Sequence, residues 1–204
     1  MAKNADITVI EIGCANTASV LFALERLGVN AKLSSDPAEI AAAPKVVLPG
    51  VGAAGFAMAR IRELGLFDTI RALKVPLLGV CLGQQLLFDS STEGDVECLG
   101  LIPGQVTKMG VAGDLPKNLV VPHMGWNQLA VTRDDPLTTG VKDGDFAYFV
   151  HSFVCPVNDF TLATSTYGQP FAAMVRKGNV WGCQFHPERS STAGAQILKN
   201  FVDL

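Results

Sequence analysis

The chain has 204 residues, a formal net charge of −3 and 17% charged residues. This length fits one domain with a substantial core, and the absence of any lysine or arginine run argues against a nucleic-acid surface. The apolar stretches are too short to span a membrane and the first twenty residues lack an export signal, so we expect a cytoplasmic protein. Soluble domains typically carry about 25% charged residues, so another subunit is expected to cover part of this surface.

The five cysteines form an odd set without a Cys-x-x-Cys pair. Such a set indicates reduced thiols rather than a disulfide framework or a zinc site, and we expect neither a metal nor a cofactor. Apart from Cys81, we interpret them as packing residues, namely Cys14, Cys98, Cys155 and Cys183.

Strands and helices are expected to alternate in the first half of the chain. An apolar strand is predicted at 7–12, and a helix is expected to begin after Asn16 and to stop at Gly28. A second strand at 46–48 and a helix at 53–64 follow a similar order. This alternation is typical of a parallel sheet covered by helices on both faces.

After residue 100 the pattern changes to short strands separated by turn residues. These predict an antiparallel extension of the sheet, and a final helix is expected at 192–202. The predicted strands are 105–107, 128–131, 146–150, 162–166, 171–175 and 180–185. We therefore expect an α/β fold in a single domain over residues 1–204.

Cys81 lies in the sequence Gly-Val-Cys-Leu-Gly at 79–83, between a predicted strand at 75–80 and a predicted helix at 82–88. Glycines on both sides of a nucleophile are typical of the sharp strand-to-helix turn that exposes a reactive side chain. The helix N-terminus favours a thiolate over a thiol. A buried structural cysteine is the alternative, but the two glycines and the helix start favour a nucleophile.

The chain has three histidines, at 123, 151 and 186. His186 follows the strand at 180–185 and precedes a proline, so we expect extended chain in which His186 and Glu188 project to the same side. This arrangement predicts a triad in which His186 moves protons for Cys81 and Glu188 orients the ring. We expect His123 and His151 to make structural hydrogen bonds.

The glycine-rich loop at 50–55 has two possible interpretations. It can supply a backbone N–H that, together with the N–H of Leu82, stabilises an oxyanion. It also matches G-x-G-x-x-G between a strand and a helix, which is typical of dinucleotide binding. No acidic residue ends a strand about 20 residues later, as ribose binding requires, since Asp68 falls in a helical stretch.

With these residues assembled, the chain resembles the class I (triad-type) glutamine amidotransferases. The segments at 79–85 (Gly-Val-Cys-Leu-Gly-Gln-Gln) and 185–188 (Phe-His-Pro-Glu) carry this resemblance. The segments at 48–52, 122–127 and 148–153 are similar to those of the glutaminase subunits of imidazole glycerol phosphate synthases. The resemblance implies a flavodoxin-like, mainly parallel sheet flanked by helices.

The resemblance also implies a role for each matching residue. Cys81 would attack the glutamine carboxamide to form a thioester, His186 would protonate the ammonia and then activate water, and Glu188 would orient His186. The implied oxyanion residues are Val51, Gly52 and Leu82. The implied glutamine-binding residues are Gln85, Glu93, Ser152 and Phe153. From residue type alone, Gln85 would be a polar helix residue and Glu93 a solvated one.

A (β/α)8-barrel cyclase subunit is the implied partner in a heterodimer. Ammonia from Cys81 would enter this barrel and convert PRFAR to imidazole glycerol phosphate and AICAR in histidine biosynthesis. The residues expected at the interface are Asn16, Met124, Trp126, Tyr148 and Arg189. For Trp126 and Tyr148, plain core packing is the alternative, and Arg189 stands where the family often has lysine.

Two rival functions remain open at this point. A cysteine peptidase or another hydrolase with the same elbow would act without a synthase partner and on substrates other than glutamine. A nucleotide-binding module would use the loop at 50–55 and leave Cys81 without a role. The segments at 122–127 and 148–153 favour the amidotransferase.

Overall fold

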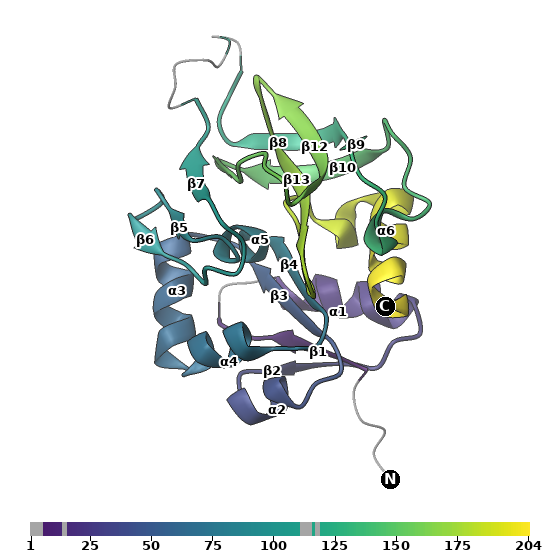
Figure 1. The fold of residues 1–204 in the computed structure, drawn as a ribbon. Helices are drawn as coiled ribbons and strands as arrows, with labels where there is room; N and C mark the ends of the chain where they lie inside the picture. Colours follow the sequence, from purple (N-terminus) through teal and green to yellow (C-terminus); the bar gives the residue numbers. More distant parts are fainter. Residues whose placement is uncertain (1–5, 14–15, 111–115, 117–118) are drawn as a thin grey trace.

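The computed structural model describes residues 6–13, 16–110, 116 and 119–204 (Figure 1). Asn16 caps the first helix as expected, because its Oδ1 accepts the Ser19 N–H at 3.4 Å. Within the described residues, no helix combines the length and the apolarity that crossing a membrane requires. The helices are α1 (Thr17–Arg26), α2 (Pro37–Ala41), α3 (Ala54–Glu63), α4 (Leu66–Ala72), α5 (Leu82–Leu86) and α6 (Ser191–Asp203), with short 3-10 turns η1 (Pro136–Thr138) and η2 (Pro187–Arg189).

The largest sheet has eight strands and a mixed direction. Its strands follow each other in space as β2 (Ala31–Ser34), β1 (Ile7–Ile10), β3 (Val46–Gly50), β4 (Leu77–Cys81), β14 (Val180–Cys183), β13 (Gln169–Lys177), β12 (Thr161–Tyr167) and β9 (Ala130–Val131). Pairing is parallel from β2 to β14 and antiparallel from β14 to β9. The expected parallel sheet with an antiparallel extension is confirmed.

Two smaller sheets lie beside the large one (Figure 1). An antiparallel pair joins β8 (His123–Gln128) to β10 (Phe146–His151). A four-stranded sheet has the order β11 (Phe153–Val154), β7 (Gln105–Lys108), β5 (Ser90–Ser91) and β6 (Val96–Glu97). Strands β10 and β11 matter for the site because their junction, at residues 150–153, lines the cavity beside Cys81.

The hydrophobic core forms two clusters, one on each face of the parallel strands. Residues of α1 and α6, such as Leu24 and Phe201, belong to one cluster. Residues of α3, α4 and α5, such as Met58, Ile70 and Leu86, belong to the other. Every residue of β1, β3 and β4 is buried, as expected for parallel strands covered on both sides.

Strand β8 is the clearest difference from the predicted elements, since a strand was expected only at 128–131. Its inward positions carry His123, Gly125 and Asn127, whereas Met124 and Trp126 point outward and are exposed. The usual alternation of apolar residues inside and polar residues outside is therefore reversed, and a pattern search for half-buried strands misses it. Strand β2 and helix α2 are also absent from the predicted set.

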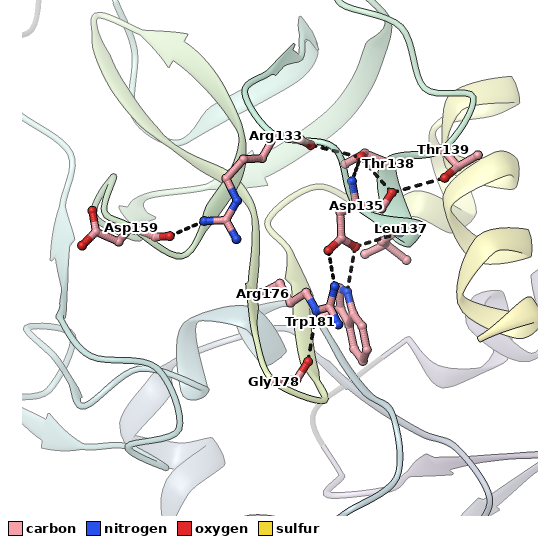
Figure 2. A network of polar contacts seen from close by, with 9 residues as sticks. All are labelled: Arg133, Asp135, Leu137, Thr138, Thr139, Asp159, Arg176, Gly178 and Trp181. Carbon is pink, nitrogen blue, oxygen red and sulfur yellow. Dashed lines mark hydrogen bonds and ion pairs between the residues drawn. The ribbon is translucent and has the colours of Figure 1, made fainter.

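A polar network around Asp135 ties η1 to strands β13 and β14 (Figure 2). The Asp135 side chain is 3% exposed, and its Oδ2 pairs with Arg176 Nη1 at 2.6 Å. Its Oδ1 accepts the Trp181 indole N–H at 3.0 Å and the Leu137 N–H at 2.9 Å. The Arg176 guanidinium also lies 4.6 Å from the centre of the Trp181 ring. This network fixes β14, the strand that leads into the candidate site.

We expect Asp135→Ala to lower the free energy of unfolding by about 3 kcal/mol, because the change leaves the buried Trp181 N–H and the half-buried Arg176 guanidinium without their acceptor. The neighbouring exposed residue supplies a matched control, and Asp134→Ala should change stability by less than about 0.5 kcal/mol. Urea unfolding followed by fluorescence measures both values. Equal stability of the two variants would contradict the structural role of Asp135.

Candidate active site

Strand β4 runs directly into helix α5 at Cys81, as the motif predicts. The backbone of Cys81 has φ 54° and ψ −111°. A positive φ is uncommon for a residue other than glycine, and such strained conformations are concentrated at functional sites. The turn places Cys81 at the carboxyl end of a parallel strand, where α/β sheets bind their ligands.

The glycines on either side of Cys81 are required by close backbone contacts. A Cβ atom on Gly83 would lie 1.8 Å from the carbonyl oxygen of Leu48 in β3. A Cβ atom on Gly79 would lie 2.7 Å from the backbone of Gly83. Helix α5 can therefore start against the sheet only because neither position has a side chain.

A cavity of about 280 Å³ opens beside Cys81. It brings together nine predicted site residues, namely Val51, Gly52, Cys81, Leu82, Gln85, Glu93, Ser152, Phe153 and His186. Three further lining residues, Pro122, Val150 and His151, were not predicted as site residues. The cavity thus joins the residues that follow β3 and β14 and the β4–α5 turn with the end of β10.

His186 and Glu188 form a buried pair, with His186 Nδ1 2.9 Å from Glu188 Oε1. Their side chains are 9% and 3% exposed. The expected reason for this pairing was wrong, because the chain is not extended through Glu188. Residues Pro187–Arg189 instead form the 3-10 turn η2, and this turn brings the carboxylate back to the ring.

The electrostatics of His186 suit a proton donor. Burial lowers the pKa of the His186 imidazole, but its contacts with Cys81 and Glu188 outweigh burial and raise this pKa to about 10. The other ring nitrogen, Nε2, is buried and has no hydrogen-bond partner among the described residues. A protonated ring whose Nδ1 is held by Glu188 can deliver the proton on Nε2 to a leaving group.

Glu93 is a lining residue of the cavity and also a helix cap. Its Oε2 accepts the Ala54 N–H at 2.8 Å, in the first turn of α3. Ala53 precedes this turn and has no capping side chain of its own. Glu93 therefore links the cavity to the loop that contains Val51 and Gly52, and it is more than a solvated surface residue.

The same contact argues against the nucleotide-binding interpretation of the loop at 50–55. Phosphate-binding loops leave the N–H groups of the following helix free for an anion. Here a protein carboxylate, Glu93, already occupies the start of α3. Gly52, with φ 94°, faces the cavity that also contains Cys81.

Gln85 and Gln184 form a buried amide pair below the cavity. Gln85 Nε2 donates to the Phe153 carbonyl oxygen and to Gln184 Oε1, both at 3.0 Å. Gln184 Nε2 in turn lies 3.9 Å from Cys81 Sγ. Sequence reasoning missed Gln184, although a glutamine between two apolar residues at the end of a buried strand is a usable signal.

Four of the five residues expected at an interface, all except Asn16, lie on β8, β10 and η2 near His186. Met124 is 64% exposed and Trp126 is 52% exposed, so core packing does not describe Trp126. The Trp126 and Tyr148 rings meet edge to face at 5.9 Å, and the Arg189 guanidinium lies 5.3 Å from the Tyr148 ring. The Tyr148 carbonyl oxygen accepts the His186 N–H at 3.0 Å, which joins this cluster to the site.

Three other cysteines are buried away from the cavity. Burial raises the pKa of Cys98 to about 11 and that of Cys155 to about 12, and it raises the pKa of Cys183 well above its usual value. These thiols stay protonated near neutral pH, as expected for packing residues. The interpretation of Cys14 falls outside the described residues.

The strained cysteine, the buried histidine–glutamate pair and the sheet edge define a class of α/β protein with a cysteine-based acyl-transfer site. Comparison with known proteins agrees with this class. The family model of glutamine amidotransferase class-I matches residues 8–204. The chain therefore belongs to the class I glutamine amidotransferase family.

Two relatives of about 50% identity carry the same subunit name within this family. Imidazole glycerol phosphate synthase subunit HisH of Xanthomonas axonopodis pv. citri is 51% identical over 199 residues, covering 98% of each chain. The subunit of the same name from Vibrio parahaemolyticus is 47% identical, covering 97% of this chain and 98% of its own.

Solved structures share the fold at lower identity. A structure described as a glutamine amidotransferase is 20% identical, with a TM-score of 0.74 and 97% coverage of each chain. The structure of PurLQS from Thermotoga maritima is also 20% identical, with a TM-score of 0.64 and the same coverage. These likenesses concern the fold alone.

We expect the His186 imidazole to titrate near pH 10 in the wild type and at lower pH in Cys81→Ala and Glu188→Gln, because each change removes a group that raises its pKa. Since the folded pKa exceeds the unfolded value, the stabilisation is complete below about pH 6.5 and is lost as pH rises through 10. NMR titration of the ring protons measures the shift. An unchanged His186 titration in both variants would contradict the assigned contacts.

Proposed function

We propose that this chain is the glutaminase subunit of an imidazole glycerol phosphate synthase and acts as a single glutamine amidotransferase domain over residues 1–204. The observation that carries this proposal is that Cys81 and His186 line one cavity, while Glu188 holds the His186 ring at 2.9 Å. The HisH relatives, at 47–51% identity over nearly the full chain, support the specific pathway.

In the first step, the Cys81 thiolate attacks the carboxamide carbon of glutamine. The developing oxyanion is stabilised by the Leu82 N–H and by backbone N–H groups at Val51 and Gly52. His186 Nε2 donates its proton to the amide nitrogen, and the C–N bond breaks to release ammonia and leave a thioester. His186, now neutral, takes a proton from water, which attacks the thioester and releases glutamate and the thiolate.

Glutamine binding is assigned to the part of the cavity lined by Glu93, Gln85, Ser152 and Phe153. The Glu93 carboxylate suits the α-ammonium group of the substrate, and its second oxygen remains available while Oε2 caps α3. Gln85, Ser152 and Phe153 complete this wall. The buried position of Gln85, held by the Phe153 carbonyl, orders the backbone that the substrate would contact.

The proposed partner is a (β/α)8-barrel cyclase subunit that receives the ammonia. With PRFAR, this subunit would produce imidazole glycerol phosphate and AICAR for histidine biosynthesis. The exposed cluster of Met124, Trp126, Tyr148 and Arg189 is the proposed docking face, because apolar aromatic side chains beside an active site are typical of an interface. Asn16, exposed at the start of α1, is assigned to the same interface.

We expect Cys81→Ala to reduce glutamine hydrolysis by about 10³-fold or more, because no other side chain can form the thioester. The assay measures glutamate released by the chain with the cyclase subunit and PRFAR. Cys98→Ala, which removes a buried thiol away from the cavity, is the matched control and should retain activity. Wild-type activity in Cys81→Ala would overturn the mechanism.

The same assay separates the rival hydrolase. A peptidase would cleave peptide or other amide substrates without the cyclase subunit, and its rate would not respond to PRFAR. Rapid Cys81-dependent turnover of such substrates by the isolated chain, with no turnover of glutamine, would replace the proposed function.

We expect Trp126→Ala to weaken assembly with the cyclase subunit by about 10-fold or more, since buried tryptophans commonly dominate interface energies. Phe56→Ala is the matched control, because Phe56 is an aromatic residue of α3 that is 57% exposed and belongs to none of the elements that carry the proposed interface residues. Isothermal titration calorimetry gives both dissociation constants. Equal affinities would place the interface elsewhere.

A further inference from the structure

We propose that His123 and Asn127 are positioning residues for the glutamine cavity, acting through His151 on the Phe153 carbonyl group. This proposal rests on the proposed function, because it assigns these residues a part in substrate binding. His123 and Asn127 lie on β8, and His151 lies at the end of β10 and lines the cavity.

A continuous series of hydrogen bonds joins these residues. His151 Nδ1 lies 2.8 Å from the Phe153 carbonyl oxygen. His151 Nε2 lies 3.1 Å from His123 Nδ1, and His123 Nε2 lies 3.4 Å from Asn127 Nδ2. Asn127 Nδ2 also donates to the Thr166 carbonyl oxygen at 2.9 Å. The series therefore crosses from β12 through β8 and β10 to the cavity wall.

The direction of every bond in the series is fixed from both ends. A carbonyl oxygen only accepts, so His151 Nδ1 must carry the proton that bonds to Phe153. At the other end, Asn127 Oδ1 accepts the Gln128 N–H at 2.8 Å, which leaves the amide NH₂ group facing His123. His123 Nε2 must then accept, His123 Nδ1 must donate, and His151 Nε2 must accept.

This direction requires both imidazoles to be neutral, and their surroundings keep them so. Burial lowers the pKa of His151 to about 3 and that of His123 to about 4. Neither ring can therefore take over the proton transfer assigned to His186. Their part is geometric. Each neutral ring donates one hydrogen bond and accepts one, so the two rings fix the distance between Asn127 and the Phe153 carbonyl group and transfer no proton.

Packing restricts the His123 ring to this orientation. The ring stacks on Tyr167 at 4.1 Å with an interplanar angle of 20°, and on Phe149 at 5.1 Å with an angle of 21°. Phe171 meets the His151 ring edge to face at 4.9 Å. Because the rings cannot turn freely, a change in the position of β8 is passed to His151 and on to the Phe153 carbonyl.

The Phe153 carbonyl has a second anchor, the amide of Gln85 at 3.0 Å. Two donors thus hold one backbone oxygen in the wall assigned to glutamine binding. Strand β8 carries Met124 and Trp126 on the side opposite His123 and Asn127. The series consequently begins on the strand whose outer face is the proposed docking face.

A pair of substitutions at His123 tests the proposal. The amide of His123→Asn can reach the position of Nδ1 and keep a donor for His151, whereas His123→Gln places its amide near the position of Nε2 and loses that donor. With the cyclase subunit and PRFAR present, His123→Gln should raise the KM for glutamine by about 10-fold, equivalent to about 1.4 kcal/mol, with a smaller change in kcat. His123→Asn should recover most of this loss.

A second measurement does not depend on activity. NMR spectra that correlate ring protons with ring nitrogens report the tautomer, and wild-type His151 should carry its proton on Nδ1, with Nε2 accepting. His123→Gln should shift the His151 Nε2 resonance, since its donor is removed. Thr166→Ala, which changes an exposed side chain and keeps the backbone carbonyl oxygen that accepts from Asn127, should leave this resonance and the KM unchanged.

Each result decides between a positioning role and a structural one. Equal KM values for His123→Gln and the wild type, or equal losses in His123→Gln and His123→Asn that follow a lower melting temperature, would overturn the proposal. A wild-type His151 with its proton on Nε2 would also overturn it. Absence of Cys81-dependent glutamine hydrolysis would overturn the proposed function instead, and the tautomer measurement would still test the hydrogen-bond series.

Discussion

The approach of helix α5 to strand β3 is the constraint on which the site depends. No side chain fits between Gly83 and the Leu48 carbonyl oxygen, since a Cβ atom there would be 1.8 Å away. This contact forces a sharp turn at Cys81 and holds it with a positive φ. The conformational strain at Cys81 is sustained by a fully buried sheet, because β3 and β4 are covered on both faces.

The register of the sheet then assembles the remaining groups around Cys81. Gly50 pairs with Cys81 across β3 and β4, so the loop with Val51 and Gly52 begins beside the thiol. Cys183 pairs with Val80 across β14 and β4, so Gln184 and His186 follow at the same edge. Parallel strands deliver their carboxyl ends together, which explains how residues about a hundred positions apart share one cavity.

The sequence allowed prediction of those features that are encoded locally. The elbow at Cys81 rests on two glycines and a helix start within five residues, and the cap of α1 rests on Asn16 alone. Features that depend on tertiary pairing were not predictable in this way. Strand β8 was missed because its polar residues face inward. Gln184 was missed because it comes next to Cys81 only when β14 pairs with β4.

The three histidines have different roles because their surroundings differ: one is suited to proton transfer and two to holding neighbouring groups in place. His123 and His151 have both ring nitrogens engaged and pKa values lowered by burial. His186 is also buried, but Cys81 and Glu188 raise its pKa to about 10, and its Nε2 has no partner among the described residues. An acid near neutral pH must hold a proton and have a nitrogen free to deliver it. Of the three rings, His186 alone meets both requirements, while the neutral rings of His151, which lines the cavity, and His123, which bonds to it, are held in place by their hydrogen bonds.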